Sequence, residues 1–80
     1  MADLWFVSKE NALKEFGVHL RKIRDAKSMS QQQLADEAEI SKRAIQKIEN
    51  GMQNPSLLVL KAIAKALNVS LSSLISYDSE

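Results

Sequence analysis

The sequence predicts an all-α fold, a compact globule of five crossing helices joined by short corners. Glycine and proline are scarce, with two and one among the 80 residues, and this scarcity favours helices over a β architecture. Apolar residues recur at three- and four-residue spacing along several segments, as on the buried face of a helix. A serine stands directly before most of these segments, where its side-chain oxygen can cap the first turn.

The first helix is expected from about Ser8 to Lys27, and it opens a single helical domain over residues 8–75. Residues 1–7 precede it as an apolar arm, because the run Leu4–Val7 is too short to indicate a helix or a strand. Gly17 interrupts the helical pattern at a cost of about 1 kcal/mol relative to alanine. It either lets another helix approach closely or marks a loosened N-terminal turn. The predicted buried face of this helix consists of Leu13, Phe16, Leu20 and Ile23.

Two short helices follow, at about residues 31–38 and 42–49, with a tight corner between them. Ser30 and Gln33 form a Ser-x-x-Gln capping box at the start of the first short helix. Ser41 stands where it can cap the second.

The remaining sequence predicts two further helices. Gly51 ends the helix at 42–49, since glycine suits the left-handed position after a helix. The turn at 54–56 opens a fourth helix, with proline near its first position. Ser70 caps a short fifth helix from Leu71 to about Ile75, and residues 76–80 form a fraying C-terminal tail.

Composition argues against several kinds of site. The chain has no cysteine, which rules out disulfides, thiolate zinc sites and cysteine nucleophiles. His19, the one histidine, has no second ligand at metal-binding spacing, and no serine lies in a nucleophile-elbow pattern. No apolar run approaches the roughly 18 residues that span a bilayer, and the N-terminus lacks the order of a secretory signal. We therefore expect no enzyme activity, metal, cofactor or membrane contact, and a cytoplasmic location.

Charge is unevenly distributed, although the formal net charge is only +1. Seven basic and four acidic residues lie between positions 21 and 47, and two lysines with no acid lie between 50 and 77. This distribution predicts a basic side built from helix ends and from the helix at 42–49.

The functional prediction depends on the two faces of the helix at 42–49. Ile45 and Ile48 fall on one side and anchor it to the core, so the other side faces solvent or a ligand. Arginine, lysine and glutamine carry donors that pair with the edges of guanine and adenine in the major groove of DNA. The predicted outer side carries Lys42, Arg43, Gln46 and Lys47.

Residues 16 to 75 resemble the helix-turn-helix domain of the Cro/phage-repressor (xenobiotic response element) family, which has a lambda-repressor-like DNA-binding fold. The resemblance rests on the joint order and spacing of many positions over about 60 of the 80 residues. The matching positions are Phe16-Gly17, Arg21, Arg24, Ser30-Gln31, Leu34-Ala35, Ala38, Ile40-Ser41, Ile45, Ile48-Glu49-Asn50-Gly51, Asn54-Pro55-Ser56-Leu57, Leu60, Ala64, Ala66-Leu67 and Val69-Ser70-Leu71.

The resemblance implies roles for individual residues. Gln31 would contact a phosphate and brace the recognition helix, and Arg24 and Glu49 would form a structural ion pair between the first and third helices. Relatives often carry glycine at the positions of Ser28 and Glu39, where a left-handed backbone would cost a non-glycine residue about 1–2 kcal/mol. The implied DNA-binding set is Gln31, Ser41, Lys42, Arg43, Gln46, Lys47 and Asn50.

Taken together, these features predict a sequence-specific DNA-binding transcriptional regulator. We expect a repressor that acts as a homodimer on a pseudo-palindromic operator in double-stranded DNA, with each third helix in a major groove. Relatives often pair through the last helix, which makes that face one candidate for the dimer contact. The candidate dimer residues are Leu71, Leu74, Ile75 and Tyr77 near the C-terminus, and Trp5 and Phe6 in the arm.

The arm leaves other interpretations open. Trp5 and Phe6 could pack on their own subunit, contact the second subunit or form a patch for another protein. In the last case the chain would be an antitoxin-like module that binds a toxin and also regulates its own operon. A DNA-free interaction domain with the same fold is a third possibility.

Overall fold

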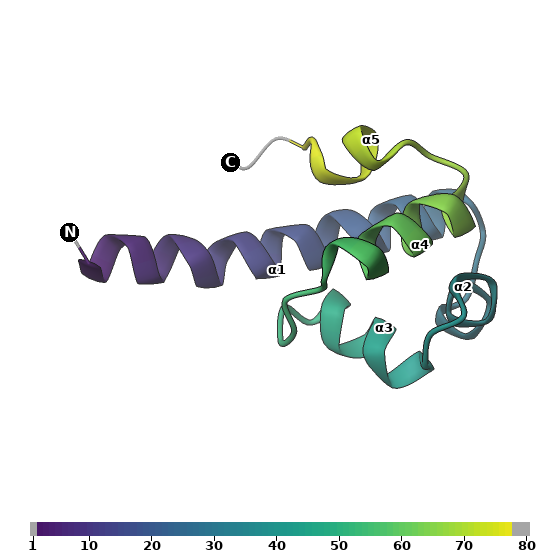
Figure 1. The fold of residues 1–80 in the computed structure, drawn as a ribbon, viewed down its shortest axis with the longest axis horizontal. Coiled ribbons are helices and arrows are strands. Elements are labelled where there is room, and N and C mark those ends of the chain that lie inside the picture. Colours follow the sequence, from purple (N-terminus) through teal and green to yellow (C-terminus); the bar gives the residue numbers. More distant parts are fainter. Residues whose placement is uncertain (1, 78–80) are drawn as a thin grey trace.

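The computed structural model describes residues 2–77, with side chains from Lys9 onward. Within that range the chain is all α-helical, as the sequence predicts (Figure 1). The two short helices have the predicted bounds. The five helices are α1 (Ala2–Ala26), α2 (Gln31–Ala38), α3 (Lys42–Glu49), α4 (Leu57–Leu67) and α5 (Leu71–Ile75).

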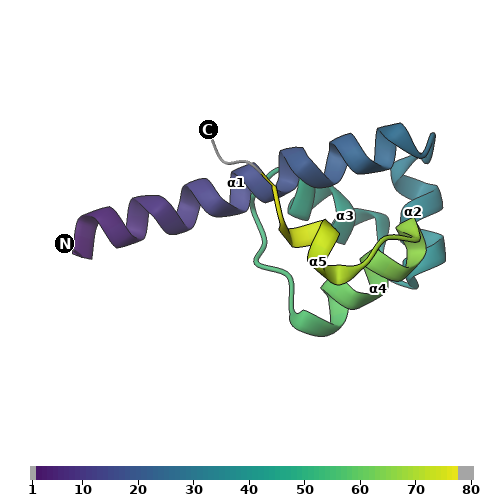
Figure 2. The ribbon, with the colours of Figure 1, turned by 90° about the horizontal axis from the view of Figure 1, so that it is seen from above.

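Helix α1 begins six residues earlier than predicted, at Ala2 rather than about Ser8. Residues 2–7 are therefore the first turns of α1, because no glycine or proline interrupts the chain before Gly17. Figures 1 and 2 show that the N-terminal half of α1 projects beyond the other helices. The side chains of Trp5 and Phe6 lie outside the described residues, so their roles stay predictions.

The hydrophobic core lies where the helices cross. Helix α2 packs against both α3 and α4, whereas α1 packs against α3 and α5. Each helix supplies at least one fully buried aliphatic side chain to the core, so the fold is held by contacts between helices rather than within them. The fully buried side chains are Leu20, Leu34, Ile45, Ile48, Ile63, Leu67 and Leu74.

Serine caps set the starts of the four shorter helices. The hydroxyl of Ser30 accepts a hydrogen bond from the Gln33 amide at 3.0 Å, and the Gln33 side chain accepts one from the Ser30 amide at 2.7 Å, so the predicted capping box is formed. Ser41 and Ser70 cap α3 and α5 as predicted, and Ser56 caps α4 in the same way. Each cap satisfies an amide that the first turn would otherwise leave without a partner.

Left-handed residues turn the chain between several of these helices. Ser28 and Glu39 have φ angles of 56° and 59°, so both positions where relatives often carry glycine are left-handed here. Asn68 has the same conformation at the end of α4. Gly51, with φ of 70°, supplies the predicted left-handed position after α3.

Gly17 lies where α1 crosses α3. A Cβ atom on this residue would stand 2.3 Å from the carbonyl oxygen of Glu49 and 2.7 Å from that of Ile48. Gly17 therefore serves the close approach of another helix, the first of its two predicted roles, because its missing side chain allows the two backbones to come together.

The C-terminal segment differs from the predicted tail as far as it is described. The Tyr77 ring stacks on His19 with ring centres 4.6 Å apart, and its hydroxyl donates to the Ala12 carbonyl at 3.3 Å. Residue 77 therefore packs on α1 rather than fraying, while residues 78–80 lie outside the described residues. Among the described helices, none combines the length and apolarity needed to cross a bilayer.

Candidate nucleic-acid interface

Helices α2 and α3 form a compact pair joined by a corner at Glu39 and Ile40. Leu34 and Ala35 on α2 are fully buried, so the inner face of that helix lies against its neighbours. The Ile40 amide donates to the Ala35 carbonyl at 3.0 Å, and its side chain packs against the core. The left-handed Glu39 lets the chain leave α2 and enter α3 within a few residues.

Helix α3 has one buried and one exposed side, as its sequence predicts. Ile45 and Ile48 are 0% and 1% exposed, so they fix the rotation of the helix about its axis. That rotation leaves Lys42, Arg43 and Gln46 exposed. Lys47 is half-buried, and Asn50 is exposed directly after the helix. We call the set of Lys42, Arg43, Gln46, Lys47 and Asn50 the outer surface of α3.

The N-terminus of α3 adds partial positive charge to this surface. Ser41 is exposed and accepts a hydrogen bond from the Ala44 amide at 3.0 Å. The amides of Lys42 and Arg43 belong to the first turn, where helical amides have no partner within the helix. No acidic residue lies in that turn, so the helix dipole and the two side-chain cations act in the same direction.

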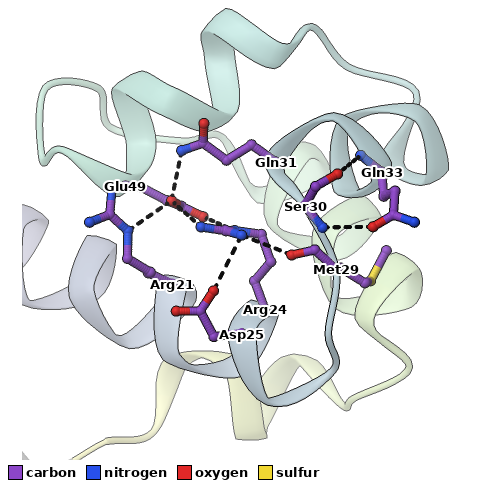
Figure 3. Close-up of polar contacts among 8 residues, drawn as sticks. All are labelled: Arg21, Arg24, Asp25, Met29, Ser30, Gln31, Gln33 and Glu49. Atoms are coloured by element: carbon purple, nitrogen blue, oxygen red, sulfur yellow. Dashed lines mark hydrogen bonds and ion pairs between the residues drawn. The ribbon is translucent and has the colours of Figure 1, made fainter.

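A polar cluster around Glu49 joins α3 to α1 and α2 (Figure 3). The Glu49 side chain is completely buried, and the side chain of Arg24 is only 10% exposed. Arg24 Nε donates to Glu49 Oε2 at 2.6 Å, and Arg24 Nη2 donates to Oε1 at 3.0 Å. Arg24 Nη1 also donates to the Met29 carbonyl at 2.8 Å, which holds the turn before α2. The structure thus places the implied ion pair at the crossing of α1 and α3.

The environment of the pair sets its protonation. Burial raises the pKa of the Glu49 carboxyl, but hydrogen bonds from Arg24, Gln31 and Arg21 lower it by more, so the pKa lies below its ordinary value. The hydrogen bond with Glu49 raises the pKa of Arg24 despite partial desolvation. The carboxylate and the guanidinium therefore stay charged at neutral pH.

Gln31 and Arg21 complete this cluster. Gln31 Nε2 donates to Glu49 Oε1 at 2.9 Å, which ties the first residue of α2 to the end of α3. Arg21 Nε donates to the same oxygen at 3.3 Å. The sequence matched Arg21 to the family but gave it no role, although its position three residues before Arg24 puts both on one side of α1.

The predicted dimer residues near the C-terminus fall into different environments. Leu74 is 0% exposed and packs inside the protomer, so its prediction as a dimer contact is wrong. Its position in α5, two residues before the predicted tail, gives no sign that this side of the helix faces α1 and α4. Ile75 is 50% exposed, and Leu71 and Tyr77 are half-buried. Leu71 and Ile75 therefore present the apolar surface of α5 that remains.

The described part of the chain holds no group of three or more histidine, cysteine or acidic side chains that could bind a metal ion. His19 instead lies against α5 and the C-terminal segment. Its Nε2 lies 3.3 Å from the Ser73 carbonyl, and its ring stacks on Tyr77.

Comparison with known proteins places this architecture in a family. A family model described as helix-turn-helix matches residues 20–74. Over 62 residues the chain is 37% identical to the HTH-type transcriptional activator BcrR of Enterococcus faecalis, and this match covers 78% of this chain and 30% of that protein. Over 59 residues it is 36% identical to the immunity repressor protein of Bacillus phage phi105, and this match covers 74% of this chain and 41% of the repressor. The chain thus spans less than half the length of either relative.

A solved structure matches over almost its whole length. The restriction-modification controller protein C.AhdI from Aeromonas hydrophila superposes with a TM-score of 0.76 and 34% sequence identity, and the match covers 78% of this chain and 94% of that chain. The segment matched by the family model, residues 20–74, contains the α2–α3 pair, the capping box and the Glu49 cluster described above. The chain belongs to the helix-turn-helix family of Cro and phage repressors.

Proposed function

We propose that this chain binds double-stranded DNA in a sequence-specific way and regulates transcription, with α3 as the recognition helix. The main support for this proposal is the outer surface of α3, where Lys42, Arg43 and Gln46 are exposed opposite the buried Ile45 and Ile48. Long donor-bearing side chains on one side of a rigid helix are suited to reading base edges in the major groove.

The residues of the interface divide by the kind of contact they would make. Lys42 and Arg43, in the first turn of α3, point at base edges, while Gln46 and Lys47 extend that contact along the groove. Asn50 meets the DNA backbone at the other end of α3. Gln31 and the Ser41 end of α3 approach phosphates, supported by the amides at the two helix N-termini.

We further propose that the chain acts as a homodimer on a pseudo-palindromic operator and represses transcription. Two copies would place their α3 helices in successive major grooves, with half-site centres about 34–36 Å apart. Leu71 and Ile75 offer exposed apolar area on α5 for the contact between copies. The phi105 relative is an immunity repressor and BcrR is an activator; we favour repression because a dimer bound over a promoter blocks it without further contacts.

Selection from a random pool of DNA duplexes, followed by mass measurement of the purified complex, tests this proposal. We expect one enriched motif with two-fold symmetry and a mass that corresponds to two chains per duplex. Enrichment of no motif would refute sequence-specific binding. An asymmetric motif with one chain bound would refute the homodimer and leave DNA binding in place.

The projecting N-terminal half of α1 supports an antitoxin-like module as the second candidate (Figure 2). That segment extends away from the other helices, so a protein partner could bind it without covering α3. Co-purification of one partner in a fixed ratio, lost when residues 1–7 are deleted, would favour this reading. Continued binding of the deleted chain to the selected duplex serves as the control for folding.

A further inference from the structure

Arg21 is the one cation of the Glu49 cluster whose side chain reaches solvent. Its side chain is 52% exposed, whereas those of Arg24 and Glu49 are 10% and 0% exposed. Only its Nε is used, in the hydrogen bond to Glu49 Oε1. Figure 3 shows its two terminal nitrogens pointing away from the cluster, and no hydrogen bond joins them to the described residues.

The other charges of the cluster are matched without Arg21. Arg24 binds both oxygens of Glu49, and its Nη1 also lies 3.4 Å from Asp25 Oδ1. Gln31 fills a further position on Glu49 Oε1. The carboxylate is therefore neutralised by a buried partner, and Arg21 adds a positive charge at the solvent edge.

The position of Glu49 on α3 places this edge beside the proposed DNA surface. Glu49 follows Gln46 by three residues and Lys42 by seven, so the three side chains lie on one side of α3 in successive turns. Arg24 neutralises the carboxylate at the end of that row. Arg21, held from α1 by Glu49 Oε1, presents its remaining donors to solvent beside it.

From this geometry we infer that Arg21 binds a DNA phosphate next to the groove that α3 enters, with Glu49 as its positioning residue. The inference rests on the proposed DNA binding and adds a contact from α1. A guanidinium has a planar fork of donors that matches a phosphate. Because Glu49 already holds Nε, the fork is oriented before DNA arrives, which reduces the entropy lost on binding.

The salt dependence of binding to the selected duplex tests the inference, with Lys22→Ala as the matched control. Lys22 is the next residue of α1 and is also exposed, but it takes no part in the hydrogen bonds and ion pairs of the cluster. We expect Arg21→Ala to bind about tenfold more weakly at 50 mM salt and to lower the slope of log K against log salt by about 0.9. Between 50 and 200 mM salt it should therefore lose about 3.5-fold less affinity than the wild type. Lys22→Ala should keep the wild-type slope.

Neutralising single phosphates distinguishes a direct contact from an indirect structural effect. Methylphosphonate placed at the contacted phosphate should weaken the wild-type chain but leave Arg21→Ala unaffected, and the selected motif should be the same for both. If every methylphosphonate weakens both chains equally, Arg21 acts only through Glu49 and the inference is wrong. An unchanged slope in Arg21→Ala overturns this inference alone, whereas a wild-type chain that binds no duplex overturns the proposed function as well.

Discussion

Replacing Gly17 by alanine sets helix propensity against packing at the crossing of α1 and α3. In an isolated helix this exchange stabilises by about 1 kcal/mol. In this fold the new methyl group would stand 2.3 Å from the Glu49 carbonyl oxygen and 2.7 Å from the Glu49 carbonyl carbon. Both are backbone atoms, so no side chain can rotate to make room.

The two helices must then separate by about 1 Å to restore an ordinary contact distance. Overpacking of this kind costs about 1–3 kcal/mol, and the upper end applies because backbone is displaced. After subtracting the gain in helix propensity, we expect Gly17→Ala to lower the free energy of unfolding by about 2 kcal/mol. For a domain of this size that corresponds to a fall in Tm of about 8–16 °C.

Urea unfolding followed by far-ultraviolet circular dichroism measures this effect. The midpoint should fall while the m-value stays unchanged, since the native core is otherwise kept. Ala12→Gly is the matched control, because it makes the reverse exchange at an exposed site of the same helix and should cost about 1 kcal/mol. A Gly17→Ala chain as stable as the wild type, or more stable, would refute the assignment of Gly17 to helix contact.

Three further predictions concern strain, charge and assembly. In thermal melts, Glu39→Gly should stabilise the fold by about 0.5–1 kcal/mol, because it relieves the left-handed φ of 59°. Its control, Glu37→Gly inside α2, should destabilise the fold by about 1 kcal/mol. Glu49→Gln should cost about 3 kcal/mol at neutral pH, because it leaves a buried guanidinium without its partner. The folded pKa of Glu49 lies below its ordinary value of about 4.5, so the wild type should keep this stabilisation above that pH and lose it as the pH falls through the folded pKa. If the stability of Glu49→Gln falls as steeply with acid as that of the wild type, the assignment is contradicted. Ile75→Glu should shift the chain from dimer to monomer in sedimentation equilibrium with its helical content unchanged. Met52→Glu, at a more exposed apolar site outside α5, should not.

The sequence was most informative where a local signal and a packing signal agree. The bounds of α2 and α3 followed from serine caps, a left-handed glycine at residue 51 and the inward spacing of Ile45 and Ile48. Those features also fixed which side chains of α3 face outward. Local chemistry was therefore enough to predict the helix pair and its exposed surface.

Features that depend on distant contacts were harder to predict. The sequence predicts the start of α1 too late, because four consecutive apolar residues have no helical period although nothing in them breaks a helix. The sequence also predicts Leu74 at a dimer face, because the position of α5 against α1 and α4 cannot be read from five residues. The parts that Arg21 and Gln31 play around Glu49 also require the three-dimensional crossing of three helices.

The base preference of α3 variants tests the central claim most directly. Selection from a random duplex pool should be run in parallel for the wild type, Lys42→Ala, Arg43→Ala and Lys61→Ala, an exposed lysine on α4. We predict that Lys42→Ala and Arg43→Ala each lose preference at particular base pairs of each half-site, by about 1–3 kcal/mol, while Lys61→Ala selects the wild-type motif. If both α3 variants select an unchanged motif, the outer surface of α3 does not read the bases.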